Sequence, residues 1–413
     1  MEQLARRPVV PTGSAPRGRR RWRAIGRVAG VAGVLALVAS LAVAGSAAAS
    51  GVATLYVSPL GSNAASCSWA HPCRTISHTV SVAPAGSIIV VRAGTYHEQV
   101  FVTKRLTLRG FGATINANGL LGSINPLRGF GIIGMGVLVA GPGASGSVVE
   151  GFRVENAPAE GILVAMTSHV RILNNEVLHN DRGATTTFNP APAECAEQGN
   201  VPGDCGEGVH FLTVASSRAM WNDVHDNVGG FLLTDEVGPT HGNLIEYNVS
   251  KDNKLDCGIT LPSHNGDAVS DPSKGGVYDN VVAYNLSEGN GGAGVGMFAP
   301  FPGAAAYDNV IVGNTLLDNA EAGVSIHSHT PGQNVNGNVI IGNRISGNGI
   351  DPDFVNTTTH IGIAIGSVAD SVHVVVAANR ISHENVGIYR IGPIHVIGLS
   401  SNIFSSTVGV HIK

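Results

Sequence analysis

Nine short runs recur along most of this chain, and each consists of a glycine, an apolar residue, a spacer and, in all but one copy, a second apolar residue. The runs read GILV, GVHF, GFLL, GITL, GVGM, GVSI, GIAI, GIYR and GVHI, and they begin at Gly161, Gly208, Gly230, Gly258, Gly294, Gly323, Gly362, Gly387 and Gly409. Successive glycines lie 22 to 47 residues apart. A repeat this short, built of strand-length apolar runs, indicates one turn of a solenoid rather than a domain.

Each repeat contains three short strands, as in residues 309–312, 315–317 and 323–326. Alternation predicts that Val324 and Ile326 face one side of the strand and Ser325 the other. One three-strand coil cannot bury its apolar face alone. Coils stacked at roughly 4.8 Å per step pair every strand with its counterparts above and below, which predicts a parallel β-helix.

Asparagine pairs five residues apart precede most of the glycines. The pairs are Asn175 and Asn180, Asn222 and Asn227, Asn248 and Asn253, Asn285 and Asn290, Asn314 and Asn319, and Asn343 and Asn348. Asparagine tolerates the left-handed backbone of a sharp corner, and its amide can bond to backbone or to the asparagine of the next coil. We expect most of these asparagines to be structural rather than ligands.

Residues 1–49 have the order of a secretory signal peptide. Six arginines between residues 17 and 27 precede an apolar stretch over residues 28–43, and Ala47, Ala48 and Ala49 supply a small-residue cleavage site. An uncleaved membrane anchor is the alternative, although the stretch is slightly short for a span. The prediction is a secreted, extracellular protein with no membrane span after cleavage.

The cysteines agree with export. Two local pairs, Cys67–Cys73 and Cys195–Cys205, lie in polar loops and predict two disulfides. Metal binding is the alternative, but neither a Cys-x-x-Cys spacing nor an adjoining histidine cluster supports it. Cys257 follows the apolar phase of its repeat and is expected to be buried.

Cleavage of the leader makes the chain more acidic. The whole chain has 25 basic and 29 acidic residues, and the leader contains eight arginines and Glu2, which leaves 17 against 28, or a net charge near −11. This balance argues against a nucleic-acid partner. An anionic polysaccharide would be repelled unless a cation such as Ca²⁺ bridged it, so Ca²⁺ is the cofactor to consider.

The N-terminal part predicts a cap for the first coil. Ile76, Val80 and Ala83 fall on one face of a short helix, followed by strands at residues 88–91 and 100–102. A helix over the open first coil would shield its edge groups.

The segment YVSP…GS…C…PC.TI…AGTY.E, from Tyr56 to Glu98, together with the asparagine-glycine coils, resembles the secreted right-handed parallel β-helix repeat proteins of the pectate-lyase-like superfamily. The resemblance covers essentially all of the mature chain and implies right-handed coils. Many relatives are lyases, epimerases or hydrolases of polysaccharides and others have no established activity, so the resemblance fixes the fold far better than the function.

The predicted fold is therefore all-β: one right-handed parallel β-helix of about 10–12 coils with a short N-terminal capping helix. We divide the chain into a signal peptide (1–49), a cap with the first coils (50–115) and the β-helix repeats (116–413). Insertions are expected at about 184–206 and 262–275, and the protein is expected to be a monomer.

Equivalent positions of successive coils form rows, which suggests a site. Counted from the repeat glycines, the rows bring Asp235, Glu236, His264 and His210 within roughly 5–10 Å of one another, beside both insertions. These four residues are the candidate catalytic residues, with His264 or His210 as base and Asp235 or Glu236 binding a cation or orienting a histidine. Glu207, His241 and Asp256 are the candidate substrate-binding residues.

Other interpretations remain open at this stage. Asp235 and Glu236 can instead cap a turn, and His210, His327 and His329 can be ordinary outward-facing polar residues. The aspartate pairs of polygalacturonases, the Ca²⁺ aspartates and arginine of pectate lyases, and the Asp-Pro-His-Asp motif of mannuronan epimerases are all missing. No family's catalytic residues carry over.

The sequence favours a secreted protein that acts on an extracellular polysaccharide by lyase or epimerase chemistry. The first alternative is a non-catalytic protein that binds glycan or cell-wall material, for which the candidate aromatic residues are Trp221, Tyr247, Tyr284 and Tyr307. The second is a glycoside hydrolase with paired carboxylates. A role in metal maturation is disfavoured, because the histidines lack ligand spacing.

Overall fold

The computed structural model describes residues 52–120, 134–180, 206–354 and 358–413. The chain divides into two units, Met1–Ala49 and Ser50–Lys413, and all described residues belong to the second. The predicted signal peptide and the predicted Cys195–Cys205 disulfide therefore lie outside the described residues.

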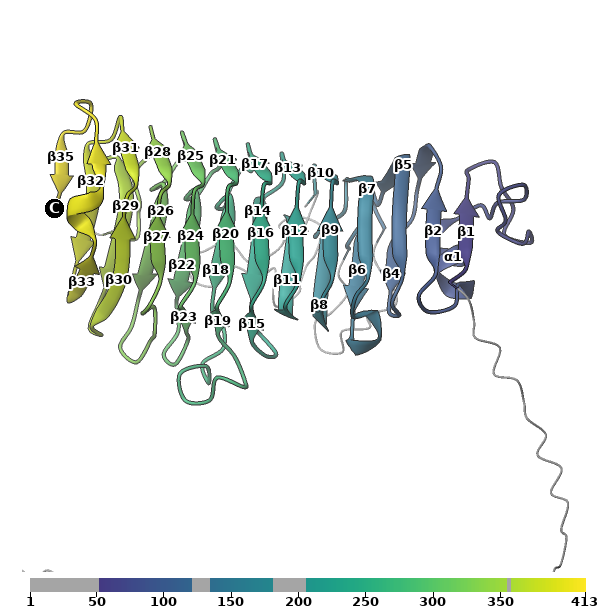
Figure 1. Ribbon diagram of the computed structural model, residues 1–413, viewed down its shortest axis with the longest axis horizontal. Coiled ribbons are helices and arrows are strands. Elements are labelled where there is room, and N and C mark those ends of the chain that lie inside the picture. Colours follow the sequence, from purple (N-terminus) through teal and green to yellow (C-terminus); the bar gives the residue numbers. More distant parts are fainter. Residues whose placement is uncertain (1–51, 121–133, 181–205, 355–357) are drawn as a thin grey trace, which may run out of the picture. The chain divides into compact units, whose positions relative to one another are not determined.

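The second unit is a β-helix, seen from the side in Figure 1. Equivalent strands of successive coils pair in parallel, and each such series of paired strands is called a column here; there are three columns among the described residues. The first column contains β1 (Thr54–Val57), β2 (Ile88–Val91), β5 (Thr107–Asn116), β7 (Val148–Glu155), β9 (Arg171–Leu173), β12 (Arg218–Met220), β16 (Leu244–Glu246), β20 (Val281–Ala283), β24 (Val310–Val312), β27 (Val339–Ile341), β30 (Val372–Ala377) and β33 (Ile394–Ile397).

The second column shares β5 and β7 with the first, because these two strands are long enough to run through both. Its other strands are β3 (Gly94–Tyr96), β10 (Glu176–Leu178), β13 (Asp223–His225), β17 (Val249–Lys251), β21 (Leu286–Glu288), β25 (Thr315–Leu317), β28 (Arg344–Ser346), β31 (Arg380–Ser382) and β34 (Ile403–Phe404).

The third column forms a separate sheet. From β8 onward, each of its main strands starts at or next to a repeat glycine. Its strands are β4 (Val100–Val102), β6 (Val137–Ala140), β8 (Ile162–Ser168), β11 (Glu207–Ala215), β14 (Gly229–Thr234), β18 (Ile259–Pro262), β22 (Val295–Ala299), β26 (Val324–Ser328), β29 (Ile361–Ser367), β32 (Val386–Ile391) and β35 (Val410–Ile412). A short branch beside β11 holds β15 (Thr240–His241), β19 (Val277–Tyr278) and β23 (Ala306–Tyr307).

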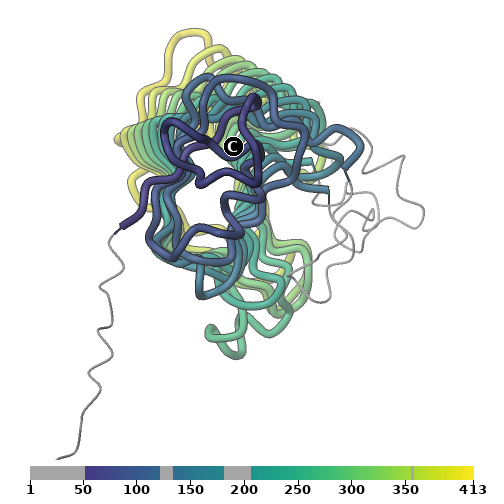
Figure 2. The backbone as a smooth tube through the Cα atoms, turned by 90° about the vertical axis from the view of Figure 1, so that its right-hand side faces the viewer, coloured from purple at the N-terminus to yellow at the C-terminus, as the bar shows by residue number. Residues whose placement is uncertain are grey.

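Viewed along the stack, the coils superimpose around a common interior (Figure 2). The register explains this interior, since one apolar residue from each coil of the third column pairs with the next: Val209, Phe231, Ile259, Val295, Val324, Ile363 and Ile388. All seven are buried. The described coils thus confirm the predicted single parallel β-helix.

The repeat glycines are required by close packing at the corner between the second and third columns. A Cβ on Gly258 would lie 2.0 Å from Ser287 Oγ, and one on Gly161 would lie 2.4 Å from Val177 Cγ1 and 2.6 Å from the carbonyl oxygen of Gly208. No larger residue fits at these corners without moving backbone.

Asparagine ladders bind successive coils together at the corners, and one of them lies beside the repeat glycines. Asn248 illustrates the pattern: its backbone N–H and its Nδ2 both donate to Asn285 Oδ1, at 2.9 and 3.0 Å, and Nδ2 also donates to the carbonyl of Ala219. One ladder runs from Asn175 to Asn402, a second runs from Asn180 to Asn348 and ends on Glu384, and a third joins Asn243, Asn280, Asn309 and Asn338. These contacts confirm that the asparagines are structural.

The first coil is capped by α1 (Ile76–Val82), as predicted. Ile76, Val80 and Ala83 are buried on the inner face of this segment. The side chain of Thr75 accepts the N-cap hydrogen bond from the backbone N–H of His78. The Glu98 carboxylate accepts from the backbone N–H groups of Ile76 and Ser77. Two 3₁₀ turns, η1 (Pro142–Ala144) and η3 (Leu399–Ser401), complete the helical elements of the described residues.

Among these residues, no helix is both long and apolar enough to traverse a lipid bilayer.

Candidate functional site

Asp235 organises the loop that projects from the stack between β18 and β19 (Figure 1). Its carboxylate is fully buried and accepts hydrogen bonds from Ser263 Oγ at 2.7 Å and from the backbone N–H groups of His264, Asn265 and Gly276. Burial raises the pKa of Asp235 and these donors oppose the rise. The carboxylate therefore holds both ends of the loop, which is a positioning role.

Glu236 lies in a turn, which the hydrogen bond from the Gly238 N–H to the Asp235 carbonyl closes, and its carboxylate contacts His264. The distance from Glu236 Oε1 to His264 Nδ1 is 2.9 Å, and both side chains are partly exposed, at 21% and 16%. Burial acts to raise the pKa of Glu236, but the hydrogen bond from His264 and the charges of His264 and His210 outweigh it and lower that pKa to about 2. An ionised Glu236 accepting from Nδ1–H leaves Nε2 as the basic nitrogen of the His264 ring.

His210 lies beside this pair but is buried, with 3% of its surface exposed. Its Nε2 is 2.8 Å from Thr234 Oγ1, at the end of β14, and its Nδ1 is 3.2 Å from Glu160 Oε1. Donor atoms of Glu160, Glu207 and His210 lie within 4.8 Å of one another. His210 occupies an outward position of β11, between the core residues Val209 and Phe211, but it is buried rather than exposed to solvent.

The rows thus bring His210, Asp235, Glu236 and His264 together, and Glu207 joins them. Glu160 was not predicted as a site residue. The sequence did contain a signal, because Glu160 and Glu207 each directly precede a repeat glycine. Strand register places these two glutamates one coil apart, since β11 pairs with β8.

Asp256 and His241, two of the candidate substrate-binding residues, have other contacts. Asp256 Oδ1 accepts from the backbone N–H of Cys257 at 2.6 Å, and it lies near Glu207 across Gly229. His241 lies in the β15 branch and stacks on Tyr278 with a centroid distance of 5.0 Å. Cys257 is buried, as predicted.

Aromatic residues form two ladders on the outside of the stack. Trp221, Tyr247 and Tyr284 stack with centroid distances of 6.4 and 5.2 Å and are each about half exposed, and His241, Tyr278 and Tyr307 stack in the same way. Their ring faces are turned towards each other. A Cβ on Gly313 would lie 2.6 Å from Tyr284, so Gly313 packs against the Tyr284 ring.

A second cluster lies further along the third column, at the end of β26. His327 Nδ1 lies 2.5 Å from His329 Nε2, and His327 Nε2 lies 3.2 Å from Asp353 Oδ2. Burial, with a contribution from His329, lowers the pKa of His327 well below its ordinary value. The expectation that His327 is a surface residue is wrong: only 5% of it is exposed, although His329 is exposed as expected. Asp353 comes from a segment between β28 and β29 that no repeat pattern marks.

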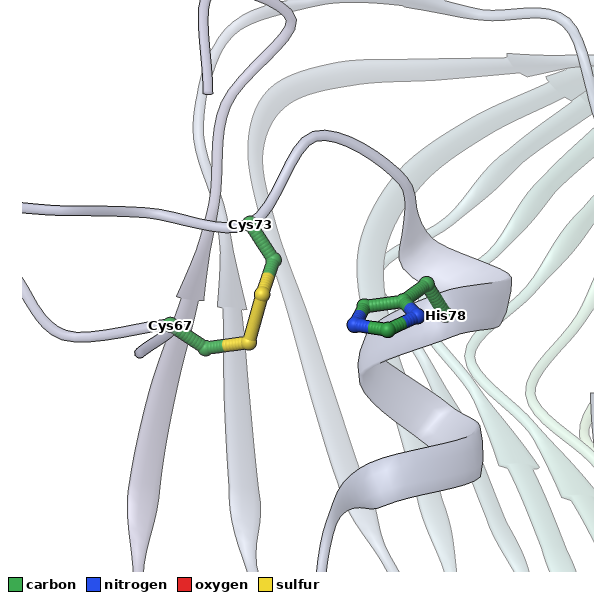
Figure 3. A group of neighbouring side chains, drawn as sticks. All are labelled: Cys67, Cys73 and His78. Atoms are coloured by element: carbon green, nitrogen blue, oxygen red, sulfur yellow. A yellow bond between two sulfur atoms is a disulfide. The ribbon is translucent and has the colours of Figure 1, made fainter. Parts of the chain in front are cut away.

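The predicted disulfide between Cys67 and Cys73 is present, with His78 of α1 beside it (Figure 3). These three residues also lie close enough together to share an ion. Because both sulfur atoms are used in the disulfide, neither is a thiolate ligand, and this group is not a metal site.

The three parallel columns and the corner ladders define the class of protein by its fold: this chain is a right-handed parallel β-helix. Residues 193–364 match the profile of a family described as periplasmic copper-binding protein (NosD). That segment includes both the His264 pair and the His327 cluster. A search of curated proteins gave no match.

Several solved structures are similar to this chain. Pectate lyase Pel9A shares 13% identity at a TM-score of 0.44, with 87% of this chain and 82% of that chain covered. An alginate lyase from Paenibacillus shares 12% at 0.46, covering 83% and 99%, and PfbA, a surface adhesin of Streptococcus pneumoniae, shares 13% at 0.45, covering 82% and 88%.

Proposed function

We propose that this protein acts outside the cytoplasm on a polysaccharide, by removing a proton from a sugar carbon in a lyase or epimerase reaction. The observation that carries the proposal is the hydrogen bond between Glu236 and Nδ1 of the partly exposed His264 ring. A carboxylate in this position fixes the tautomer of the histidine and stabilises its protonated form, as a general base requires.

His264 Nε2 would take the C5 proton of a uronic acid residue. The electrons of the broken C5–H bond are left on C5 and delocalise into the oxygens of the sugar carboxylate, where a cation or proton must offset the charge. In a lyase these electrons then form a C4=C5 double bond as the C4–O bond breaks, and the departing oxygen takes up a proton from the protonated His264 or from water. In an epimerase a proton returns to C5 from the opposite face.

The other candidate residues support this pair without touching substrate. His210 is buried, so we assign it to positioning Thr234 and to lowering the pKa of Glu236. Asp235 positions His264 through the loop backbone. Asp256 is partly exposed and adds negative charge beside the site, which favours a Ca²⁺ ion between the protein and an anionic polymer.

Two alternatives have specific support. The carboxylates of Glu160 and Glu207 are within 4.8 Å, close to the separation of about 5–5.5 Å in retaining glycosidases, but only 2% and 1% of these residues is exposed. The aromatic ladders suggest a non-catalytic glycan-binding surface, yet sugars stack on ring faces, and neighbouring rings occupy both faces of Tyr247 and of Tyr278. Both observations favour the His264 pair.

The description of the matched family bears on both the location and the role of the protein. The matched family is described as periplasmic, which agrees with export through the predicted leader, and as copper-binding, which makes metal handling a further candidate role. The Glu236–His264 pair does not require that role.

The proposal is tested with a panel of uronic-acid and neutral polysaccharides, with and without Ca²⁺. Product is detected as ultraviolet absorbance of the unsaturated sugar, as new reducing ends and as a changed epimer ratio. We expect product from a uronic-acid polymer, abolished by His264→Gln and retained by His395→Gln, which alters an exposed histidine of β33. New saturated reducing ends from a neutral polymer would support the hydrolase. Binding without product, unchanged by His264→Gln, would support the non-catalytic alternative.

A further inference from the structure

The cluster at the end of β26 combines nitrogen and oxygen donors from two separate segments. His327 and His329 lie two residues apart along the strand end, and Asp353 comes from the segment between β28 and β29. One donor atom of each lies within 4.8 Å of the other two, so a single ion can contact all three. Two ring nitrogens at 2.5 Å are closer than an ordinary N–H···N hydrogen bond places them.

The His327 ring is held in place by its surroundings. The Phe298 ring lies 4.3 Å away on one side, and Phe354 meets it edge-on at 5.8 Å. Its Nε2 is buried and makes no hydrogen bond among the described residues, although Asp353 Oδ2 is only 3.2 Å away, so the carboxylate is not aligned with a ring N–H. A polar atom this deeply buried without an aligned partner suggests a missing ligand.

The cluster opens onto a cavity of about 480 Å³, which His327, His329 and Asp353 line together with Ser328, Ser367 and Phe354. His329 is exposed, so its ring can rotate to widen the 2.5 Å separation to what two ligands of one ion require. The cavity leaves room for a water or an exogenous ligand beside the ion.

We propose that His327, His329 and Asp353 bind one divalent transition-metal ion, of the Zn²⁺ or Cu²⁺ class. Imidazole nitrogen with one carboxylate suits Zn²⁺ and Cu²⁺, whereas Ca²⁺ and Mg²⁺ prefer sets made of oxygen alone. Three protein ligands beside an open cavity resemble a site that keeps one position for water or substrate rather than a closed structural site. This inference does not depend on the proposed chemistry at His264.

The test uses the untagged full chain, freed of metal with a chelator and titrated with Zn²⁺ and with Cu²⁺ in a calorimeter. We expect one site per chain, and at least about tenfold weaker binding in His329→Ala and in Asp353→Asn. Because His329 is exposed, its replacement should leave the fold intact, which circular dichroism checks. His383→Ala, which removes another exposed histidine, is the matched control and should bind as the unaltered chain does.

Electron paramagnetic resonance of the Cu²⁺ form gives a second readout. The spectrum should show coupling to two imidazole nitrogens in the unaltered chain and to one in His329→Ala. The proposal is overturned if neither ion binds, or if both variants bind as tightly as the unaltered chain. Binding that survives both changes but is lost in Glu207→Gln would place the ion at the Glu160 cluster instead and would also overturn it.

Discussion

Single carboxylates in this protein have different roles because their partners differ. Glu236 and Asp235 are adjacent in sequence, yet one contacts a histidine ring and the other is surrounded by backbone donors. Glu384 shows a third role, since it takes the place of an asparagine at the end of a ladder and accepts from both the backbone N–H and the Nδ2 of Asn348.

Glu236→Gln tests the catalytic pair. The glutamine can still accept a hydrogen bond from His264 but no longer stabilises the protonated ring, so kcat on the active polysaccharide should fall by about 10²–10⁴ with a smaller change in KM. Steady-state kinetics measures this. An unchanged kcat would mean that Glu236 does not assist a base.

Glu384→Gln tests the charge buried in the ladder. Burial raises the pKa of Glu384 from its usual 4.5 to about 7, so the folded protein takes up a proton that the unfolded chain lacks between these values. Protonation of Glu384 therefore contributes to the free energy of unfolding. This contribution is complete below about pH 4.5 and is lost as pH rises through about 7. The variant should therefore be more stable than the unaltered chain at pH 8, by about 1–3 kcal/mol, and should lose this advantage at pH 4.

Thermal unfolding of both proteins between pH 4 and pH 9 measures the difference. Parallel stability curves at all pH values would show that Glu384 does not titrate in this range.

At the scale of elements, the loop between β18 and β19 depends on one side chain. In Asp235→Asn, an amide N–H₂ replaces an oxygen that faces backbone donors, which should destabilise the loop by about 2–4 kcal/mol. Hydrogen exchange should show faster exchange at His264, Asn265 and Gly276, while β7 and β28 exchange as before. Full protection of the loop together with lost activity would instead give Asp235 a direct catalytic role.

The asparagine ladders should matter most in the middle of the stack. Asn285→Ala removes bonds to Asn248, Asn314 and the carbonyl of Ile245, and it leaves a buried N–H of Asn248 without an acceptor, at a cost of about 3 kcal/mol. Asn402 lies at the ladder end and is closer to solvent, so Asn402→Ala should cost less. Chemical denaturation of the two variants compares them, and equal losses would contradict the ladder account.

At the scale of the whole molecule, the fold could be predicted from the sequence because every repeat independently predicts the same coil. Corner glycines such as Gly258, ladder asparagines such as Asn248 and apolar positions such as Val324 each predict the same coil. Register then follows from aligning the repeats, which is why the proximity of Glu236 to His264 could be expected from the sequence alone.

The parts that escaped prediction depend on covering segments rather than on the repeat. His210 and His327 occupy outward positions of the third column, so nothing in the alternation shows that they are buried. Asp353 reaches His327 from a segment without repeat character, so aligning the repeats does not predict this contact. Aligning the repeats predicts the position of a residue along the stack, but it does not predict whether other residues bury that position.

The central claim is that His264 removes a proton from C5 of a uronic acid, and proton NMR of the polysaccharide treated in D₂O tests it most directly. An epimerase would replace the C5 proton signal by deuterium, and a lyase would create an olefinic C4 proton, in either case with the unaltered chain and not with His264→Gln. A polysaccharide that is altered while every C5 proton remains in place, or one altered equally by both proteins, would contradict the account.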